Sequence, residues 1–123
     1  MSETMKLAVP TLGKAGLDAQ RSPHFGRCDC FTVVEITDGK VGEVSEIANP
    51  PHEEGGCLRP VGILSNAGVD AIVAAGMGMR PLMGFNQAGI TVYYEANTPR
   101  VGDVVDLVIA GKVPVMSTNE VCH

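Results

Sequence analysis

Gly68-Val-Asp-Ala-Ile-Val-Ala-Ala-Gly-Met-Gly78 is the stretch of sequence that decides the fold. Residues 69–75 are almost entirely apolar, which is typical of a parallel strand that is covered on both faces. Gly76-Met77-Gly78 then favours a tight turn that leads from this strand into a helix. A buried strand followed by a helix indicates an α/β domain, in which helices pack on the faces of a sheet.

Helical patterns lie on both sides of this strand. Apolar residues recur at helical spacing over residues 57–67, with Pro60 in the first turn and Gly68 after the end. A second helix is predicted over residues 81–88, and the strand that follows it over residues 90–94. The alternation of helix and strand favours parallel pairing in this half of the chain.

The last predicted helix has the clearest pattern. Thr98 is predicted to be its N-cap and Pro99 its first helical residue, and Gly111 follows its end. Its apolar positions recur every three or four residues: Val101, Val104, Val105, Val108 and Ile109.

The amino-terminal half predicts a different arrangement. Residues 6–10 form a short buried strand and residues 13–22 a loop, followed by a hairpin with arms at 31–37 and 41–47. Asp38-Gly39 between the arms is a strong signal for a type I′ turn. Together the two halves predict an α/β domain with a mixed sheet of about five strands and about three helices, in three layers.

Length and composition limit the domain organisation. The 123 residues, 45% of them hydrophobic, suffice for one domain with its own core. We expect this core to span about residues 6–113. Residues 114–123 show no sustained period and are expected to form a flexible tail.

Charge and composition exclude several classes of protein. Nine basic against fourteen acidic residues give a net charge of −5, and aromatic residues make up only 4%, which argues against a nucleic-acid binder. No apolar stretch is long enough to span a bilayer, and no secretory signal is evident, so we expect a cytoplasmic protein. In that compartment its four cysteines are expected to be thiols: Cys28, Cys30, Cys57 and Cys122.

Four short motifs, in this order and at this spacing, resemble the dinitrogenase iron-molybdenum cofactor biosynthesis family. They are Ala8-Val9-Pro10-Thr11, Ser22-Pro23-His24-Phe25-Gly26-Arg27, Asn49-Pro50 with His52 and Gly55-Gly56, and Gly68-Val69-Asp70 leading to Gly76-Met77-Gly78. The resemblance covers about residues 6–113 and implies a ribonuclease H-like fold. It also implies a carrier or scaffold that holds metal-sulfur clusters, including molybdenum-containing ones, without turnover.

The residues of two predicted loops point to metal chemistry. His24, Cys28 and Cys30 lie in one passage from loop to strand, and His52 and Cys57 flank a second loop. Thiolates suit copper(I), iron-sulfur or zinc, and imidazole suits several borderline metals. Our hypothesis is that at least two of these five side chains bind the cargo; the alternative for each cysteine is a buried apolar role. Strand alternation predicts that Cys28 and Cys30 share one face.

The glycine turn and the shared motifs complete the candidate site. At Gly76, Met77 and Gly78, backbone amides can approach an anionic cluster, or the glycines serve only the turn. The resemblance adds other residues that contact the cluster: Phe25, Gly26, Arg27, Gly55 and Gly56. Met79 and Met83, like Met77, are expected to pack in the core or line a pocket wall rather than act as ligands.

An enzymatic role is not expected. Ribonuclease H-like nucleases need clustered carboxylates, and residues 7–10 of the first strand carry none. A nucleophilic pair such as Cys57 with His24 remains a formal alternative.

We therefore expect a non-catalytic protein that binds, stores or delivers an iron-, molybdenum- or copper-containing cluster or precursor. Its partners would be a cluster donor or acceptor protein and, in one alternative, a second copy of the chain. The other function considered is a small-anion sensor or interaction module without a cluster.

Overall fold

The computed structural model describes residues 4–22, 28–48, 59–76 and 79–116, and over these ranges the protein has an α/β fold. The elements in chain order are β1 (Thr4–Leu12), β2 (Gln20–Arg21), β3 (Cys30–Thr37), β4 (Lys40–Ala48), α1 (Arg59–Asn66), β5 (Ala71–Ala74), α2 (Met79–Gln87), β6 (Thr91–Tyr94) and α3 (Val101–Ile109). The strands form one mixed sheet in the order β4-β3-β1-β5-β6, and the short β2 pairs with β1. The predicted fold class is confirmed.

The hairpin forms the antiparallel half of the sheet. β3 pairs with β4 on one side and with β1 on the other. Asp38 and Gly39 in the connection both have positive φ, 53° and 78°, as the predicted type I′ turn requires. β1 then joins this half to the parallel half, in which β1, β5 and β6 run in one direction.

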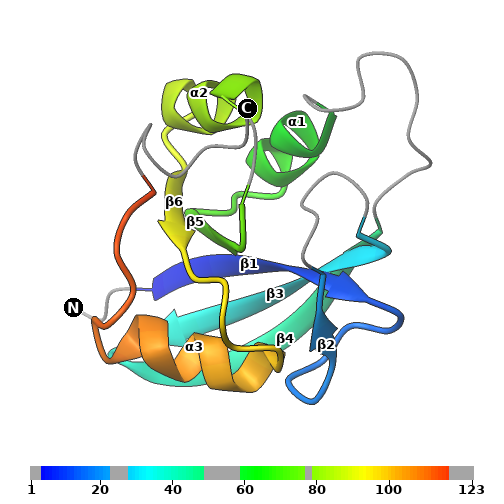
Figure 1. The fold of residues 1–123 in the computed structure, drawn as a ribbon, viewed down its shortest axis with the longest axis vertical. Helices are drawn as coiled ribbons and strands as arrows, with labels where there is room; N and C mark the ends of the chain where they lie inside the picture. Colours follow the sequence, from blue (N-terminus) through cyan, green and yellow to red (C-terminus); the bar gives the residue numbers. More distant parts are fainter. Residues whose placement is uncertain (1–3, 23–27, 49–58, 77–78, 117–123) are drawn as a thin grey trace.

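Two apolar clusters on opposite faces of the sheet produce three layers (Figure 1). On one face, α1 and α2 bury Leu64, Leu82 and Phe85 against the sheet. On the other face, α3 buries Val104 and Val105 together with other valines. Burial of such side chains from water is the main stabilising contribution to a layered domain of this kind.

The start of α3 differs from the prediction. The prediction that Thr98 caps this helix is wrong, because α3 begins at Val101 and its N-cap is Arg100, which makes no side-chain capping bond. The amides of Val101 and Gly102 instead donate to main-chain carbonyls of the loop before β2, those of Ala19 and Leu17. Carbonyl groups distant in sequence therefore replace the expected side-chain cap.

Two further segments pair with strands of the sheet. The predicted loop at 13–22 contains the strand β2. Residues 114–116 of the expected tail lie along β6: Tyr94 N donates to Pro114 O (2.9 Å), and Met116 N donates to Val92 O (2.7 Å). Met116 is only 4% exposed, since its side chain reaches the core beneath α1 and α2. These bonds satisfy backbone groups that the outer edge of β6 would otherwise leave open.

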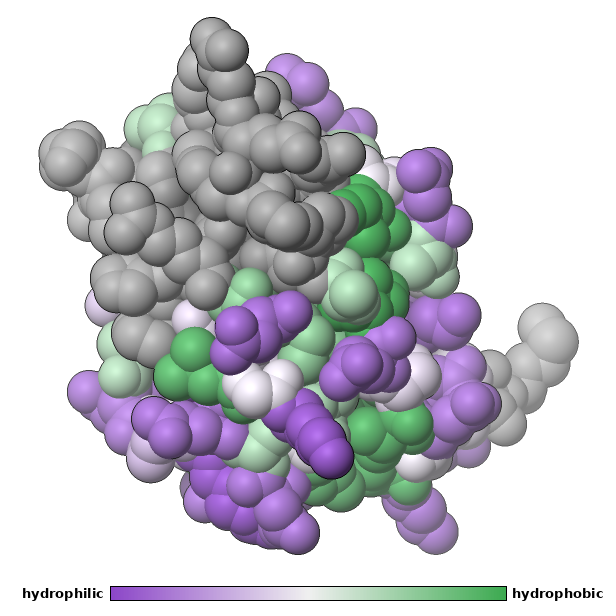
Figure 2. All heavy atoms as spheres, turned by 90° about the vertical axis from the view of Figure 1, so that its right-hand side faces the viewer, coloured by the Kyte–Doolittle hydropathy of each residue, from purple (hydrophilic) through white to green (hydrophobic). Residues whose placement is uncertain are grey.

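The described surface is mixed in polarity. On the face shown in Figure 2, hydrophilic side chains surround smaller apolar areas. Every residue of β4 except Ile47 is exposed, consistent with its position at the edge of the sheet.

Two glycine-to-alanine substitutions are expected to change stability in opposite directions. Gly89, after α2, has φ +78° and open space around it, so Gly89→Ala costs about 1 kcal/mol through backbone strain alone. Gly62 lies inside α1, also with open space around it, so Gly62→Ala stabilises the protein by about 0.5–1 kcal/mol. Urea denaturation measures the change in the free energy of unfolding for each variant. Changes of the same sign in both variants would contradict the prediction.

Candidate functional site

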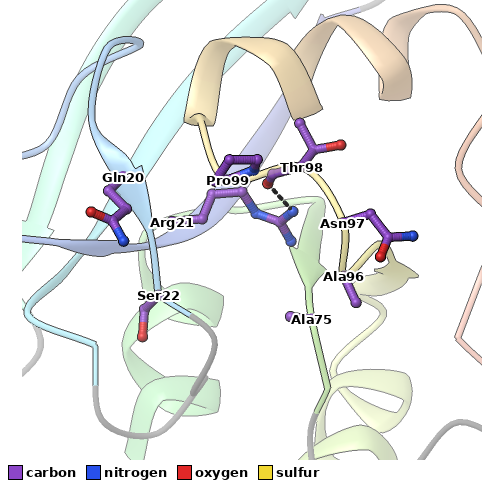
Figure 3. A pocket seen from close by; sticks show the side chains of 8 residues that line it. All are labelled: Gln20, Arg21, Ser22, Ala75, Ala96, Asn97, Thr98 and Pro99. Carbon is purple, nitrogen blue, oxygen red and sulfur yellow. Dashed lines mark hydrogen bonds between the residues drawn. The ribbon is translucent and has the colours of Figure 1, made fainter.

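A pocket of about 260 Å³ lies where the parallel strands end (Figure 3). Parallel strands place their carboxyl ends at the same edge of a sheet, where open α/β folds bind their ligands. Three parts of the chain line the pocket: residues 20–22, which pair with or adjoin the end of β1; Ala75, directly after β5; and residues 96–99, after β6.

Hydrogen bonds of the backbone hold residues 21 and 22 between two neighbouring segments. Ser22 N donates to Pro10 O (2.9 Å), and Arg21 N donates to Pro99 O (2.7 Å). The pocket is therefore built on a segment that joins the carboxyl end of β1 to the residues preceding α3.

Arg21 is the buried cation of this site. Only 6% of the residue is exposed. Its Nη1 donates to Glu95 Oε1 (3.1 Å) and to Thr98 O (2.7 Å), and its Nη2 donates to Glu95 O (2.6 Å). Its Nε is buried and finds no hydrogen-bond partner among the described residues. Burial lowers the pKa of the guanidinium, although the nearby Glu95 opposes this, and an arginine remains charged at physiological pH.

Glu95 organises the turn after β6. Its carboxylate accepts hydrogen bonds from the amides of Asn97 (2.7 Å) and Thr98 (2.9 Å), from the Thr98 hydroxyl, and from Arg21. Burial alone would raise the pKa of this carboxyl, but the bonds from Thr98, Asn97 and Arg21 outweigh it and lower the pKa. Glu95 therefore stays ionised and fixes the turn that forms one wall of the pocket.

Most predicted site residues lie outside the described residues, namely His24, Phe25, Gly26, Arg27, His52, Gly55, Gly56, Cys57, Met77 and Gly78. The described residues that flank them share one edge of the sheet. Asp29 N donates to Thr11 O (3.0 Å), close to the place where Ser22 is held. Thr11 pairs with Cys30, which in turn pairs with Ala48, the last residue of β4. Gly76 follows β5 at the same edge, so a described residue next to each of the three predicted segments lies there.

Cys28 and Cys30 are both buried thiols, but their surroundings differ. Cys28 packs in the cluster beneath α1 and α2, together with Phe31. Cys30 is adjacent to Phe31 in β3 and so points to the opposite face, where its thiol donates to Gly13 O (3.3 Å). The prediction that the two cysteines share a face is wrong, because β3 begins only at Cys30 and strand alternation does not extend to residue 28.

The thiol of Cys30 resists ionisation in its buried, acidic surroundings. Burial, followed by the negative charges of Glu46 and Asp29, raises the pKa of its thiol to about 11. Metal ligation requires the deprotonated form. A metal ion bound to this thiol would supply the positive charge that lowers its pKa.

Alkylation of Cys30 is expected to be slow. At pH 8, a pKa of about 11 leaves about 100-fold less thiolate than the ordinary value would. Peptide mass spectrometry after iodoacetamide treatment should show a rate at Cys30 that rises about tenfold per pH unit up to about pH 11. A plateau near pH 9 would contradict the raised pKa.

Of the two roles expected for Met79 and Met83, the structure excludes packing in the core and leaves the pocket wall. Met79 is 38% and Met83 51% exposed, while Leu82 and Phe85 of the same helix occupy the core. Among the residues that the structure describes, no group of three or more histidine, cysteine or acidic side chains is arranged to hold a metal ion.

Neither Arg21 nor Glu95 was predicted from the sequence as part of a site. The turn that leads from Glu95 to α3 was not predicted either. Arg21 lies in a two-residue strand, too short to show a period, and its partner is 74 residues away. The one available signal was the position of Glu95 directly after a predicted strand, at the edge where ligands bind.

These features define a small α/β domain with a mixed open sheet and a pocket at the carboxyl ends of its parallel strands. The chain belongs to the dinitrogenase iron-molybdenum cofactor family, whose sequence model matches residues 5–111. Membership implies a role related to nitrogenase or to the biosynthesis of its iron-molybdenum cofactor.

Individual proteins are similar to this chain in sequence or in fold. Uncharacterized protein MJ0580 of Methanocaldococcus jannaschii is 35% identical over 112 residues, which cover 89% of each chain. The crystal structure of PH0822 is similar with a TM-score of 0.77 and 27% identity, over 93% of this chain and 98% of that one. The apo form of the orange protein of Desulfovibrio gigas has a TM-score of 0.81 over 95% and 97% of the two chains; at 22% identity it supports the fold.

Proposed function

We propose that this protein binds a metal-sulfur cluster, or a precursor of one, that contains iron, molybdenum or copper, and holds it for storage or delivery without catalysing a reaction. The observation that supports the proposal is the position of the described residues that flank the three predicted segments. The described residues next to residues 23–27, 49–58 and 77–78 all lie at the carboxyl edge of the sheet. Family membership supplies the class of cargo.

The chemistry of this edge suits an anionic cargo. The segment with Gly76 leads into the amino-terminal end of α2, where the helix dipole favours negative charge. We propose that at least two of five side chains hold the cargo: His24, His52, Cys28, Cys30 and Cys57.

Delivery requires a second protein that donates or accepts the cluster, and we propose that this exchange takes place in the cytoplasm, where thiols stay reduced. No helix in the described parts of the chain is long and apolar enough to cross a membrane.

Metal and sulfide analysis tests the proposal. Protein purified without oxygen is incubated with iron, sulfide, molybdate and copper, desalted, and analysed for metal, acid-labile sulfide and absorption spectrum. We expect stoichiometric uptake that His24→Ala weakens at least about tenfold. The matched control is His123→Ala, which changes the same residue type near the carboxyl terminus, and it should leave uptake unchanged. Absence of uptake under all conditions would overturn the proposal and favour a small-anion sensor or interaction module.

A further inference from the structure

Helix α2, which lies beside α1 on one face of the sheet (Figure 1), exposes two methionines. Leu82 and Phe85 of this helix are buried in the core, whereas Met79 and Met83 are exposed. Methionine is among the residue types that folded proteins bury most often. Neither of these two methionines contributes to the core, and a solute can reach both side chains.

The spacing of the two methionines brings their sulfur atoms within reach of one ion. α2 is a regular helix from Met79 to Gln87, and residues four apart in a helix have Cβ atoms about 5–6 Å from one another. Helical side chains lean toward the amino-terminal end, so that of Met83 leans toward Met79. Three rotatable bonds in each side chain then allow both sulfur atoms to contact the same small ion.

The chemistry of this pair favours a soft metal. Thioether sulfur is a soft, uncharged ligand of the kind that selects copper(I), whereas magnesium and calcium prefer oxygen ligands. No residue of α2 carries a carboxylate. Two neutral ligands also suit a monovalent ion better than a divalent one, because nothing on the helix compensates further positive charge.

The helix dipole should make binding weaker. Met79 lies in the first turn of α2, where the dipole disfavours a cation and reduces its affinity about two- to fivefold. An ion that is held weakly is also released readily. The pair is therefore better suited to passing a metal ion on than to storing it.

The pair is also close to the edge at which we place the cargo. Gly76 follows β5 at the carboxyl edge of the sheet, and α2 begins at Met79. Three residues of chain span at most about 11 Å, so the Cα atom of Met79 lies within that distance of the Cα atom of Gly76.

We infer that Met79 and Met83 form a two-thioether site for copper(I), separate from the five side chains proposed to hold the cargo. The sequence favoured a packing role for both methionines, and the structure excludes the core position on which that expectation partly depended. The existence of the site does not depend on the proposed function. Its use as a point at which copper(I) enters or leaves the cargo site rests on that function.

The test is a titration of the full-length protein, labelled with carbon-13 at its methionine methyl groups, with silver(I) as a soft monovalent probe. Thiolates also bind soft metals, so silver is added beyond the amount that the four cysteines can bind, and an electrode measures the free silver. We expect the methyl signals of Met79 and Met83 to shift with one common midpoint. Met79→Leu should weaken the response of Met83 at least about tenfold, and Met83→Leu that of Met79, because each loses the second ligand.

The controls separate a specific site from general effects of metal. Met5→Leu makes the same volume-conserving change in β1 and should leave the midpoint within about twofold. Magnesium chloride should shift neither methyl signal. Copper(I), added without oxygen, should reproduce the shifts seen with silver(I).

Four results would overturn the inference. They are an absence of shifts at both methionines, a Met83 response that Met79→Leu leaves unchanged, an equal response to magnesium, or a response to silver(I) that copper(I) does not reproduce. His24→Ala separates the two proposals, because it should weaken cluster uptake and leave the methionine response within about twofold. A methionine response without cluster uptake removes the proposed function alone, and cluster uptake without a methionine response removes this site alone.

Discussion

Replacing Glu95 with alanine is expected to destabilise the protein by about 3 kcal/mol, because it leaves the Arg21 guanidinium buried without its counter-charge. The two side chains are 5% and 14% exposed, so solvent compensates little of this loss. The turn after β6 also loses the acceptor for the amides of Asn97 and Thr98. Urea denaturation measures the effect.

The matched control for this prediction is Glu43→Ala in β4. Glu43 is exposed, so its removal should change the free energy of unfolding by less than about 0.5 kcal/mol. The double variant Arg21→Met/Glu95→Gln should be more stable than Glu95→Ala, since it leaves no buried charge unpaired. A cost below about 1 kcal/mol for Glu95→Ala would show that Arg21 does not depend on this carboxylate.

The same pair predicts a pH dependence. The pKa of Glu95 is lowered in the folded protein, so the unfolded chain takes up the proton at a higher pH than the folded protein does. The stabilisation is therefore complete above the ordinary carboxyl pKa of about 4.3 and is lost as the pH falls through the lower folded value. Glu95→Gln should flatten the decline of stability in this acid range, and an unchanged slope would contradict the assignment.

Replacing Phe85 with alanine should cost about 3–5 kcal/mol, the other large effect expected here. Phe85 is fully buried and packs with Leu64, Leu82 and Ile72 in the cluster that joins α1 and α2 to the sheet. Its loss would open a cavity between layers that short helices of eight and nine residues have little capacity to close. Denaturation in urea or guanidinium gives the change in unfolding free energy.

Met83→Ala is the control on the same helix. Met83 is 51% exposed, so its truncation should cost less than about 1 kcal/mol. Similar losses for Phe85→Ala and Met83→Ala would mean that α2 packs on the sheet through another face.

The sequence by itself determined the elements whose signals are local. The apolar run at residues 71–74, the Asp38-Gly39 turn and the valine stripe of α3 each depend on neighbours a few residues away, and the structure confirms all three. The apolar pattern of each strand and helix also determines which of its faces is buried. Buried faces of this kind lead to a layered α/β fold. The order of the family motifs likewise needed no tertiary information, and the family match confirms it.

The tertiary structure alone decided features that depend on residues far apart in the chain. The cap of α3 comes from the carbonyls of Leu17 and Ala19, which no pattern near Thr98 reveals. Cys28 and Cys30 point to opposite faces because β3 begins only at Cys30, where it first pairs with Thr11 of β1. Arg21 meets Glu95 only because the sheet brings the carboxyl ends of its parallel strands to one edge. Local sequence specifies the apolar pattern of each element and the turns between elements. Pairing between distant parts of the chain brings Arg21 and Glu95 together beside the pocket.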